Sequence, residues 1–156
     1  MSEVPIRAVS GPADIALARG LFEEYAAWLD ENLCFQGFPE ELATLPGAYA
    51  PPRGRLLLAG PPGDSYGCVA LRPIAESIGE IKRLYVQPRA RGRRAGLALA
   101  RAIIAESEGV GYRTLKLDTL ARMTEARALY TKLGFVECAP YYHSKLATTI
   151  YMERVR

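Results

Sequence analysis

The sequence predicts a mixed α/β fold, in which helices cover both faces of a sheet of six to seven strands. Strand-like segments come first, and a strand, helix, strand, helix and strand then follow one another. The chain is 49% hydrophobic and 24% charged, which is typical of a folded globular protein. We expect one domain over residues 1–156, because neither a repeat nor a linker interrupts the chain.

The first predicted elements are a strand and two helices. Apolar and polar residues alternate over residues 4–9, which predicts a short strand. Pro12 and Asp14 suit the first turn of a helix over residues 11–32, where apolar residues recur at helical spacing. Glycine and proline residues then set off a short helical segment at residues 38–45.

The rest of the chain continues as further strands and helices. A hairpin is expected where the turn PPGDS joins two apolar segments. The later segments alternate between the patterns of buried strands and of amphipathic helices. The predicted elements are strands at residues 54–60, 65–74, 79–88, 113–120, 135–139 and 148–155, and helices at residues 91–109 and 124–134.

The composition argues against several classes of protein. The net charge of +3 is too mild to indicate a nucleic-acid partner. The three cysteines lack CxxC spacing and His143 is the only histidine, so we expect no disulfide framework, no metal site and no serine or cysteine hydrolase. We find no membrane-spanning stretch and no secretory signal in residues 1–10, which favours a cytoplasmic protein without a membrane partner. The oligomeric state stays open, with a homodimer as one option.

Arginine residues gather between the predicted strand at 79–88 and the helix after it, where the chain reads KRLYVQPRARGRRAGLALARAII. Backbone N–H groups at a helix N-terminus and arginine side chains both bind phosphate. The loop also follows the carboxyl end of a strand, where ligands of α/β sheets collect. It contains neither GxxxxGK[ST] nor GxGxxG. The residues alone therefore leave two interpretations open, an anion-binding loop and a solvated basic loop.

Two segments resemble the signatures of one enzyme family. LYVQPRARGRRAG, followed by an apolar helix, is similar to the acyl-CoA signature [QR]xxGx[GA] of the GNAT N-acetyltransferase superfamily. AxxLYxxxGF, at residues 126–135, is similar to the second signature of that family. The resemblance implies a GNAT-like fold with a split between the strands at 79–88 and 113–120. It also implies direct transfer of an acetyl group from acetyl-CoA to an amine acceptor, either a small molecule or a peptide.

The chain departs from the family pattern at two positions. Arg94 stands where the middle glycine of the loop is usual, and Met123 replaces an asparagine often found before the last helix. A side chain disfavours positive φ, so we expect the loop to avoid positive φ at Arg94. Because of these departures, a noncatalytic acyl-CoA-binding or sensor module is the alternative function.

The resemblance implies which residues bind acetyl-CoA, the co-substrate. One strand is expected to pair its backbone with the pantetheine arm, and the Val86 N–H is expected to polarise the thioester carbonyl. The amides of the arginine loop are expected to contact the pyrophosphate. The candidate cofactor-binding residues are Leu84, Tyr85, Val86, Arg91, Gly92, Arg93, Arg94, Ala95, Gly96, Thr124, Ala126 and Leu129.

Two side chains are the catalytic candidates. By the resemblance, Tyr130 protonates the departing thiolate, although a tyrosine on an apolar helical stripe is also a common core residue. The resemblance also makes Glu80, near the start of the cofactor-binding strand, the candidate base that deprotonates the amine, directly or through water. Its other interpretation is an exposed carboxylate paired with Lys82 or Arg83. Asp118 is the competing base.

The acceptor is expected to bind between the first helical region and the loop before the last strand. Aromatic side chains in both segments suit an apolar or cationic amine, although ordinary packing also explains them. The substrate candidates are Tyr25, Phe35, Asp118 and Tyr142. The sequence does not identify the acceptor.

Overall fold

One mixed sheet runs through the computed structural model, which describes residues 3–30, 37–144, 146 and 148–156. In this part of the chain the sheet has seven strands in the order β1-β2-β3-β4-β5-β7-β6. Only β4 and β5 are parallel neighbours, and the other pairs are antiparallel. The strands are β1 (Ile6–Ala8), β2 (Arg55–Ala59), β3 (Gly67–Ala75), β4 (Ile78–Val86), β5 (Thr114–Leu120), β6 (Val136–Glu137) and β7 (Thr149–Val155). The predicted mixed sheet is confirmed.

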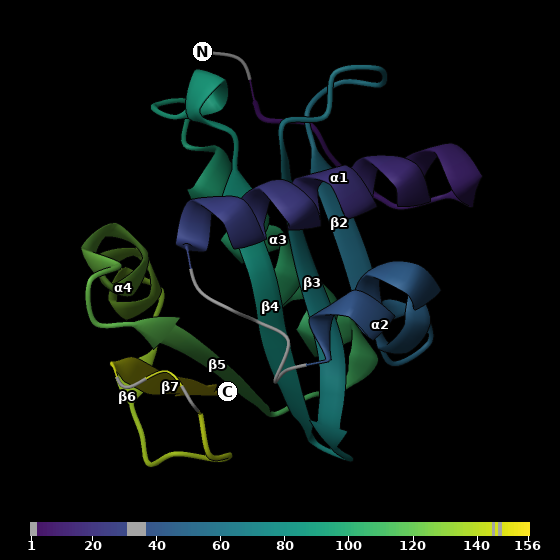
Figure 1. Ribbon diagram of the computed structural model, residues 1–156. Helices are drawn as coiled ribbons and strands as arrows, with labels where there is room; N and C mark the ends of the chain where they lie inside the picture. Colours follow the sequence, from purple (N-terminus) through teal and green to yellow (C-terminus); the bar gives the residue numbers. More distant parts are fainter. Residues whose placement is uncertain (1–2, 31–36, 145, 147) are drawn as a thin grey trace.

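Helices cover both faces of this sheet (Figure 1). The helices α1 (Gly11–Leu29) and α2 (Phe38–Thr44) lie on one face, and α3 (Ala95–Val110) lies on the other, while α4 (Thr124–Lys132) stands beside β5. Each face has its own hydrophobic cluster of buried side chains. Because apolar residues are buried on both faces, the middle strands are apolar along most of their length. No helix of the described residues is long and apolar enough to cross a bilayer.

Among the described residues, two helix boundaries differ from the prediction by three residues or more. Helix α1 ends at Leu29 because Asp30 adopts a left-handed conformation with a φ of 56°. Helix α3 begins at Ala95, whereas the sequence pattern placed the start at residue 91. The arginine-rich residues before Ala95 form a short 3-10 turn and a loop instead.

The strands β4 and β5 pair only where they begin. Residues 78–80 of β4 pair with residues 114–116 of β5, and the ladder continues no further. Beyond that point the two strands diverge, as Figure 1 shows, while β5 pairs with β7 along its whole length. The second half of β4 therefore has a backbone edge that β5 does not cover. This is the split that the sequence analysis predicted.

Candidate active site

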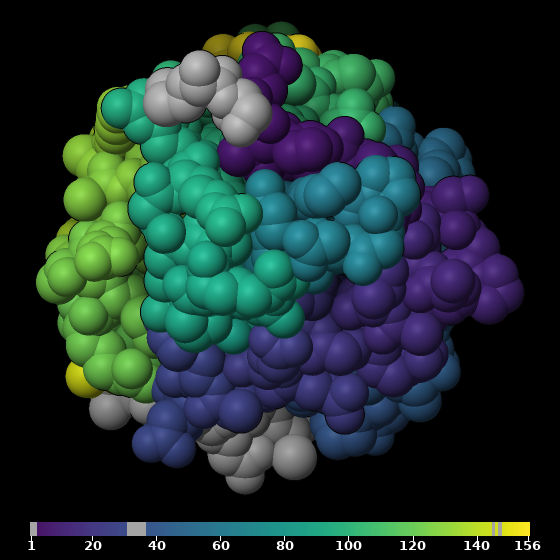
Figure 2. All heavy atoms as spheres, turned by 90° about the horizontal axis from the view of Figure 1, so that it is seen from above, coloured from purple at the N-terminus to yellow at the C-terminus, as the bar shows by residue number. Residues whose placement is uncertain are grey.

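A cavity of about 570 Å³ lies beside the arginine loop, and this volume is typical of small-molecule sites. Its walls come from the end of β4, the loop, the start of α4 and Trp28 of α1. In Figure 2 the teal atoms of the loop lie beside the green atoms of α4 and the indigo end of α1. The predicted cofactor-binding residues in its lining are Leu84, Tyr85, Val86, Arg91, Gly92, Arg94, Ala95, Gly96, Thr124, Ala126 and Leu129.

Arg94 adopts a left-handed backbone conformation, with φ of 61° and ψ of 25°. The expectation that the loop avoids positive φ at this residue is therefore wrong. Helix α3 begins at the next residue, Ala95, and Gly92 before it also has a positive φ of 87°. A non-glycine residue in this conformation costs roughly 1–2 kcal/mol. The Arg94 side chain does not cap α3, so the first N–H groups of the helix have no side-chain cap.

The loop arginines divide between two directions. The Arg91 Nε donates to the Val86 carbonyl at 3.2 Å, and the Arg91 guanidinium lies 5.2 Å from the centre of the Trp28 ring. Arg91 is thus held at the mouth of the cavity. Arg93, by contrast, lies over the Tyr66 ring at 5.8 Å and does not line the cavity. Among the predicted loop arginines, Arg91 and Arg94 therefore line this cavity and Arg93 does not.

A smaller cavity of about 80 Å³ continues from the first one into the split of the sheet. Trp28, Leu84, Met123 and Ala126 line both cavities, so the two spaces are adjoining. The smaller cavity is also lined by the predicted residues Tyr25, Asp118 and Tyr130, together with Lys82 and Arg83 of β4. Helices α1 and α4 and both diverging strands thus meet at this point.

Tyr130 lies on α4 with 6% of its surface exposed. Its ring packs edge-on against Phe135, with 5.5 Å between the ring centres. Burial raises the pKa of the Tyr130 hydroxyl, so the phenol stays protonated at neutral pH and is able to donate a proton. Within the described part of the chain, this hydroxyl has no hydrogen-bond partner, although the side chain lines the smaller cavity.

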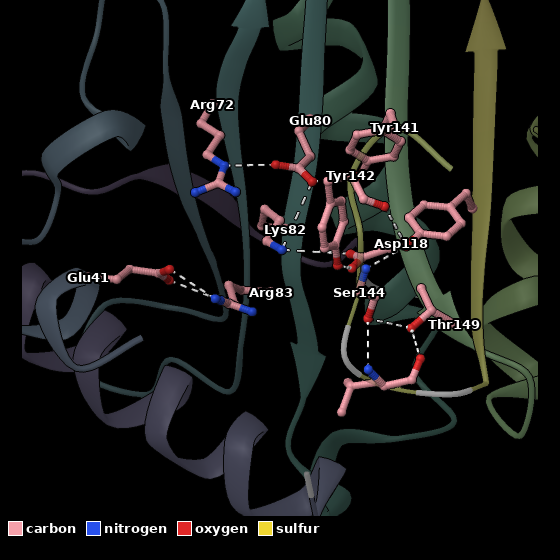
Figure 3. A network of polar contacts seen from close by, with 12 residues as sticks. Glu41, Arg72, Glu80, Lys82, Arg83, Asp118, Tyr141, Tyr142, Ser144 and Thr149 are labelled. Carbon is pink, nitrogen blue, oxygen red and sulfur yellow. Dashed lines mark hydrogen bonds and ion pairs between the residues drawn. The ribbon is translucent and has the colours of Figure 1, made fainter. Parts of the chain in front are cut away.

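A row of alternating charges crosses the sheet beside the smaller cavity (Figure 3). The Arg72 Nε donates to the Glu80 carboxylate at 2.8 Å, and the Lys82 Nζ lies 4.0 Å from Glu80 and 3.7 Å from Asp118. Burial lowers the pKa of Lys82, because an ammonium loses hydration there. Glu80 is only 2% exposed, so it is not the exposed carboxylate of the other interpretation. Asp118 and Lys82 line the smaller cavity, whereas Glu80 does not.

Two consecutive tyrosines hold the two candidate bases. The Tyr141 hydroxyl donates to Glu80 at 2.6 Å, and the Tyr142 hydroxyl donates to Asp118. The rings of Tyr141 and Tyr142 also contact the Tyr151 ring, with 5.4 Å and 5.5 Å between ring centres. The predicted substrate residue Tyr142 thus supports Asp118 and is absent from the lining of the smaller cavity.

Some residues of the site escaped the sequence analysis. Lys82 and Arg83 were considered only as partners of Glu80, although a charged pair inside the apolar strand IKRLYV was a usable signal. Arg122 lines the larger cavity and donates to the Leu29 carbonyl of α1, and no pattern pointed to it. Phe35, a predicted substrate residue, lies outside the described residues. The described part of the chain contains no cluster of potential metal ligands.

Comparison with solved structures supports the fold. An acetyltransferase from Streptococcus agalactiae superposes with a TM-score of 0.81 at 16% identity, over 100% of both chains. The protein yncA from Salmonella typhimurium, solved with its cofactor acetyl-CoA, superposes with a TM-score of 0.70 at 18% identity, over 99% of this chain and 94% of that one. At these identities the likeness establishes the fold alone.

Sequence relatives establish the family. An uncharacterised N-acetyltransferase of Schizosaccharomyces pombe is 39% identical over 153 residues, which is 97% of this chain and 94% of that protein. IAA acetyltransferase from Azospirillum brasilense is 38% identical over 93 residues, or 59% of this chain and 61% of that protein. Residues 19–135 match the acetyltransferase (GNAT) family, so the match includes the arginine loop, the split strands and Tyr130. The chain therefore belongs to the GNAT family of acetyltransferases.

Proposed function

We propose that this enzyme transfers the acetyl group of acetyl-CoA directly to a primary amine held in the split of the sheet. The main support for this proposal is that a cofactor-sized cavity at the arginine loop adjoins a smaller cavity, which is lined by the protonated Tyr130 and the carboxylate of Asp118. One cavity suits a long phosphorylated ligand, and the other suits the reacting groups at its end. In the reaction a C–N bond forms and the C–S bond of the thioester breaks.

The larger cavity is proposed to hold the CoA portion. The uncapped N-terminus of α3 and the side chains of Arg91 and Arg94 face a common space, which suits the pyrophosphate. The uncovered edge of β4 suits the pantetheine amides, which would extend the sheet as an added strand. The Val86 N–H then polarises the thioester carbonyl and stabilises the negative charge that develops on its oxygen.

Tyr130 is proposed as the acid that protonates the CoA thiolate. A buried phenol is a suitable donor because it stays protonated at neutral pH, and a thiol has an ordinary pKa near 8.5, so the thiolate accepts the proton. The ring is fixed by Phe135, while the hydroxyl has no described protein partner that would compete for its proton. These two properties support a proton donor more than a core tyrosine.

Asp118 and Glu80 are proposed to remove the proton from the acceptor ammonium. The amine is neutral on the order of only a thousandth of the time at pH 7, so a base is required. Asp118 lines the cavity and therefore suits direct contact, while Glu80 is connected to it through Lys82. We propose that Asp118 accepts the proton. Asp118 is then neutral, and Glu80 remains as the carboxylate that balances the charge of Lys82. The acceptor is proposed to be an apolar or cationic amine, because Tyr25 and Trp28 line the same cavity.

The enzyme is proposed to work in the cytoplasm. Cys68 and Cys138 are both free thiols in the described part of the chain, which fits a reducing compartment. Size-exclusion chromatography with light scattering would decide between a monomer and the homodimer that the sequence left as an option.

The test is a screen of amines, polyamines, amino acids and peptides that follows release of free CoA from acetyl-CoA. At least one amine should give CoA release that is saturable and accompanied by an acetylated product in the mass spectrum. The Tyr130→Phe variant serves as the matched control, because it keeps the ring and removes the hydroxyl. Tight acetyl-CoA binding by calorimetry, without release on any amine, would instead support the noncatalytic acyl-CoA-binding module.

A further inference from the structure

Arg83 has a left-handed backbone inside a β-strand, with a φ of 62°. The other described non-glycine residues with positive φ are Asp30 and Arg94, and both stand at helix ends. A side chain in this conformation is disfavoured, so the surrounding structure must hold it there. Strain of this kind concentrates at functional sites, and Arg83 lines the smaller cavity.

The left-handed residue belongs to a β-bulge. The pairing of β3 with β4 shifts between Cys68 and Ala70, so Arg83 and Leu84 together stand opposite one residue of β3. A bulge adds one residue to a strand, and one added residue exchanges the two edges that successive N–H groups face. The bulge therefore decides which amides of β4 face the split.

The amides around and after the bulge alternate between β3 and the split. The Gln87 N–H donates to the Tyr66 carbonyl at 2.8 Å and thus faces β3. Backbone groups alternate along a strand, so the Tyr85 N–H also faces β3, and the N–H groups of Leu84 and Val86 face the uncovered edge. Without the extra residue this order would be reversed, and the Tyr85 N–H would face the split in place of those of Leu84 and Val86.

An ion pair joins the bulge to α2. The Arg83 Nε and Nη2 each donate to one oxygen of Glu41 at 2.9 Å, and the two side chains are 2% and 11% exposed. The guanidinium also lies 5.0 Å from the centre of the Phe38 ring and 5.8 Å from that of Tyr25. The Cys68 thiol donates to the Arg83 carbonyl at 3.3 Å. A bidentate, buried pair of this kind fixes direction as well as distance.

We propose that the Glu41–Arg83 ion pair is a positioning device that holds the β4 bulge so that the Leu84 and Val86 amides face the acetyl thioester. The inference rests on the proposed function, because it assigns these amides to the cofactor. Glu41 and Arg83 act through the backbone, and Glu41 itself does not line either cavity. Helix α2 lies outside both family signatures, but through this pair it influences the position of the β4 backbone at the reacting centre.

The test compares Arg83→Ala with Arg83→Gly. Both variants remove the guanidinium and leave Glu41 without its partner, but only glycine adopts positive φ without a steric cost. The readout is the carbon-13 chemical shift of the acetyl carbonyl of labelled acetyl-CoA, which moves when an N–H polarises the bound thioester. We expect a clear shift on binding to the wild type, most of it retained in Arg83→Gly and most of it lost in Arg83→Ala. Equal shifts in the two variants would overturn the proposal.

A second comparison covers the case in which Arg83→Ala does not fold. Glu41→Gln should lose the shift, because Arg83 then relaxes from its left-handed conformation. The double variant Glu41→Gln/Arg83→Gly removes both charges of this pair and should regain the shift. If Glu41→Gln keeps the full shift of the wild type, the positioning role of the ion pair is wrong.

The control is Asp14→Asn, which breaks the Arg7–Asp14 ion pair away from the cavities. The Asp14 side chain is 12% exposed, which matches Glu41 at 11%. This variant should lose stability and keep the wild-type shift, so a loss of the shift in it would count against a specific role for Glu41. The proposed function fails differently: the wild type itself would then not bind acetyl-CoA by calorimetry, or would bind it without any carbonyl shift.

Discussion

Removal of the Tyr130 hydroxyl separates its chemical role from its role in packing. The variant Tyr130→Phe keeps the ring that packs against Phe135 at 5.5 Å between centres, and it keeps the helix. The hydroxyl has no described protein partner, so no intramolecular hydrogen bond is lost. The free energy of unfolding should therefore change by less than about 1 kcal/mol, the typical net value of one hydrogen bond.

The rate of acetyl transfer should respond much more strongly than the stability. A positioned acid contributes about 10²–10⁴-fold, so kcat should fall by that factor, which corresponds to about 2.7–5.4 kcal/mol at 1.36 kcal/mol per tenfold. CoA affinity should hardly change, because the proton is needed in the transition state and not in the bound ground state. The assay measures CoA release with the best amine of the screen, and the melting temperature of the same sample.

One result would refute this reasoning. A core tyrosine predicts the reverse pattern, in which stability changes and turnover per folded molecule is preserved. A fully active but destabilised Tyr130→Phe would therefore end the assignment of Tyr130 as the acid.

The remaining predictions concern the loop and the first helix. Arg91→Ala should weaken CoA binding about 10- to 100-fold by calorimetry, because a hydrogen bond to a charged group contributes about that much. Arg53→Ala, outside the loop, should leave CoA binding unchanged. Equal losses of affinity in the two variants would mean that the loop is solvated and does not bind CoA. Arg94→Gly should hold or raise the melting temperature, because glycine relieves a left-handed conformation worth about 1–2 kcal/mol, and a lower one would contradict this. The hydrogen bond from Arg7 holds the pKa of Asp14 below its usual range, so this carboxylate stabilises the fold above about pH 4 and loses that effect as pH falls through the lowered pKa. The stability advantage of the wild type over Asp14→Asn in urea should accordingly be full at neutral pH and vanish in acid.

Much of the fold followed from local patterns. The strands and helices expected along the chain are all present among the described residues, with boundaries that moved by a few residues. The clearest shift is at the arginine loop, where the start of α3 moved from residue 91 to Ala95. Helical periodicity continues through a loop when its residues are good helix formers, so the boundary depends on the backbone of Arg94, which the pattern does not report.

The predicted cofactor-binding residues gather around one cavity because they are close in sequence. A loop and the strand before it carry most of them, so one motif locates them, and the structure places all but Arg93 in one cavity lining. The catalytic candidates were harder to place. Glu80 and Asp118 lie on different strands, and only the folded structure, with its short β4–β5 ladder, shows that Asp118 lines the smaller cavity and Glu80 does not.

The sequence by itself determined the family, the order of the elements and the loop that suits an anionic ligand, because each of these depends on neighbours along the chain. Only the tertiary structure decided which charged side chains lie next to each other. These are the row of charges from Arg72 to Asp118 across the sheet and the ion pair between Glu41 of α2 and Arg83 of β4. The physical reason is that burial and pairing belong to residues far apart in sequence. The charged residues Lys82 and Arg83 inside an apolar strand indicate that they have buried partners. Only the folded structure shows that these partners are Asp118 and Glu41.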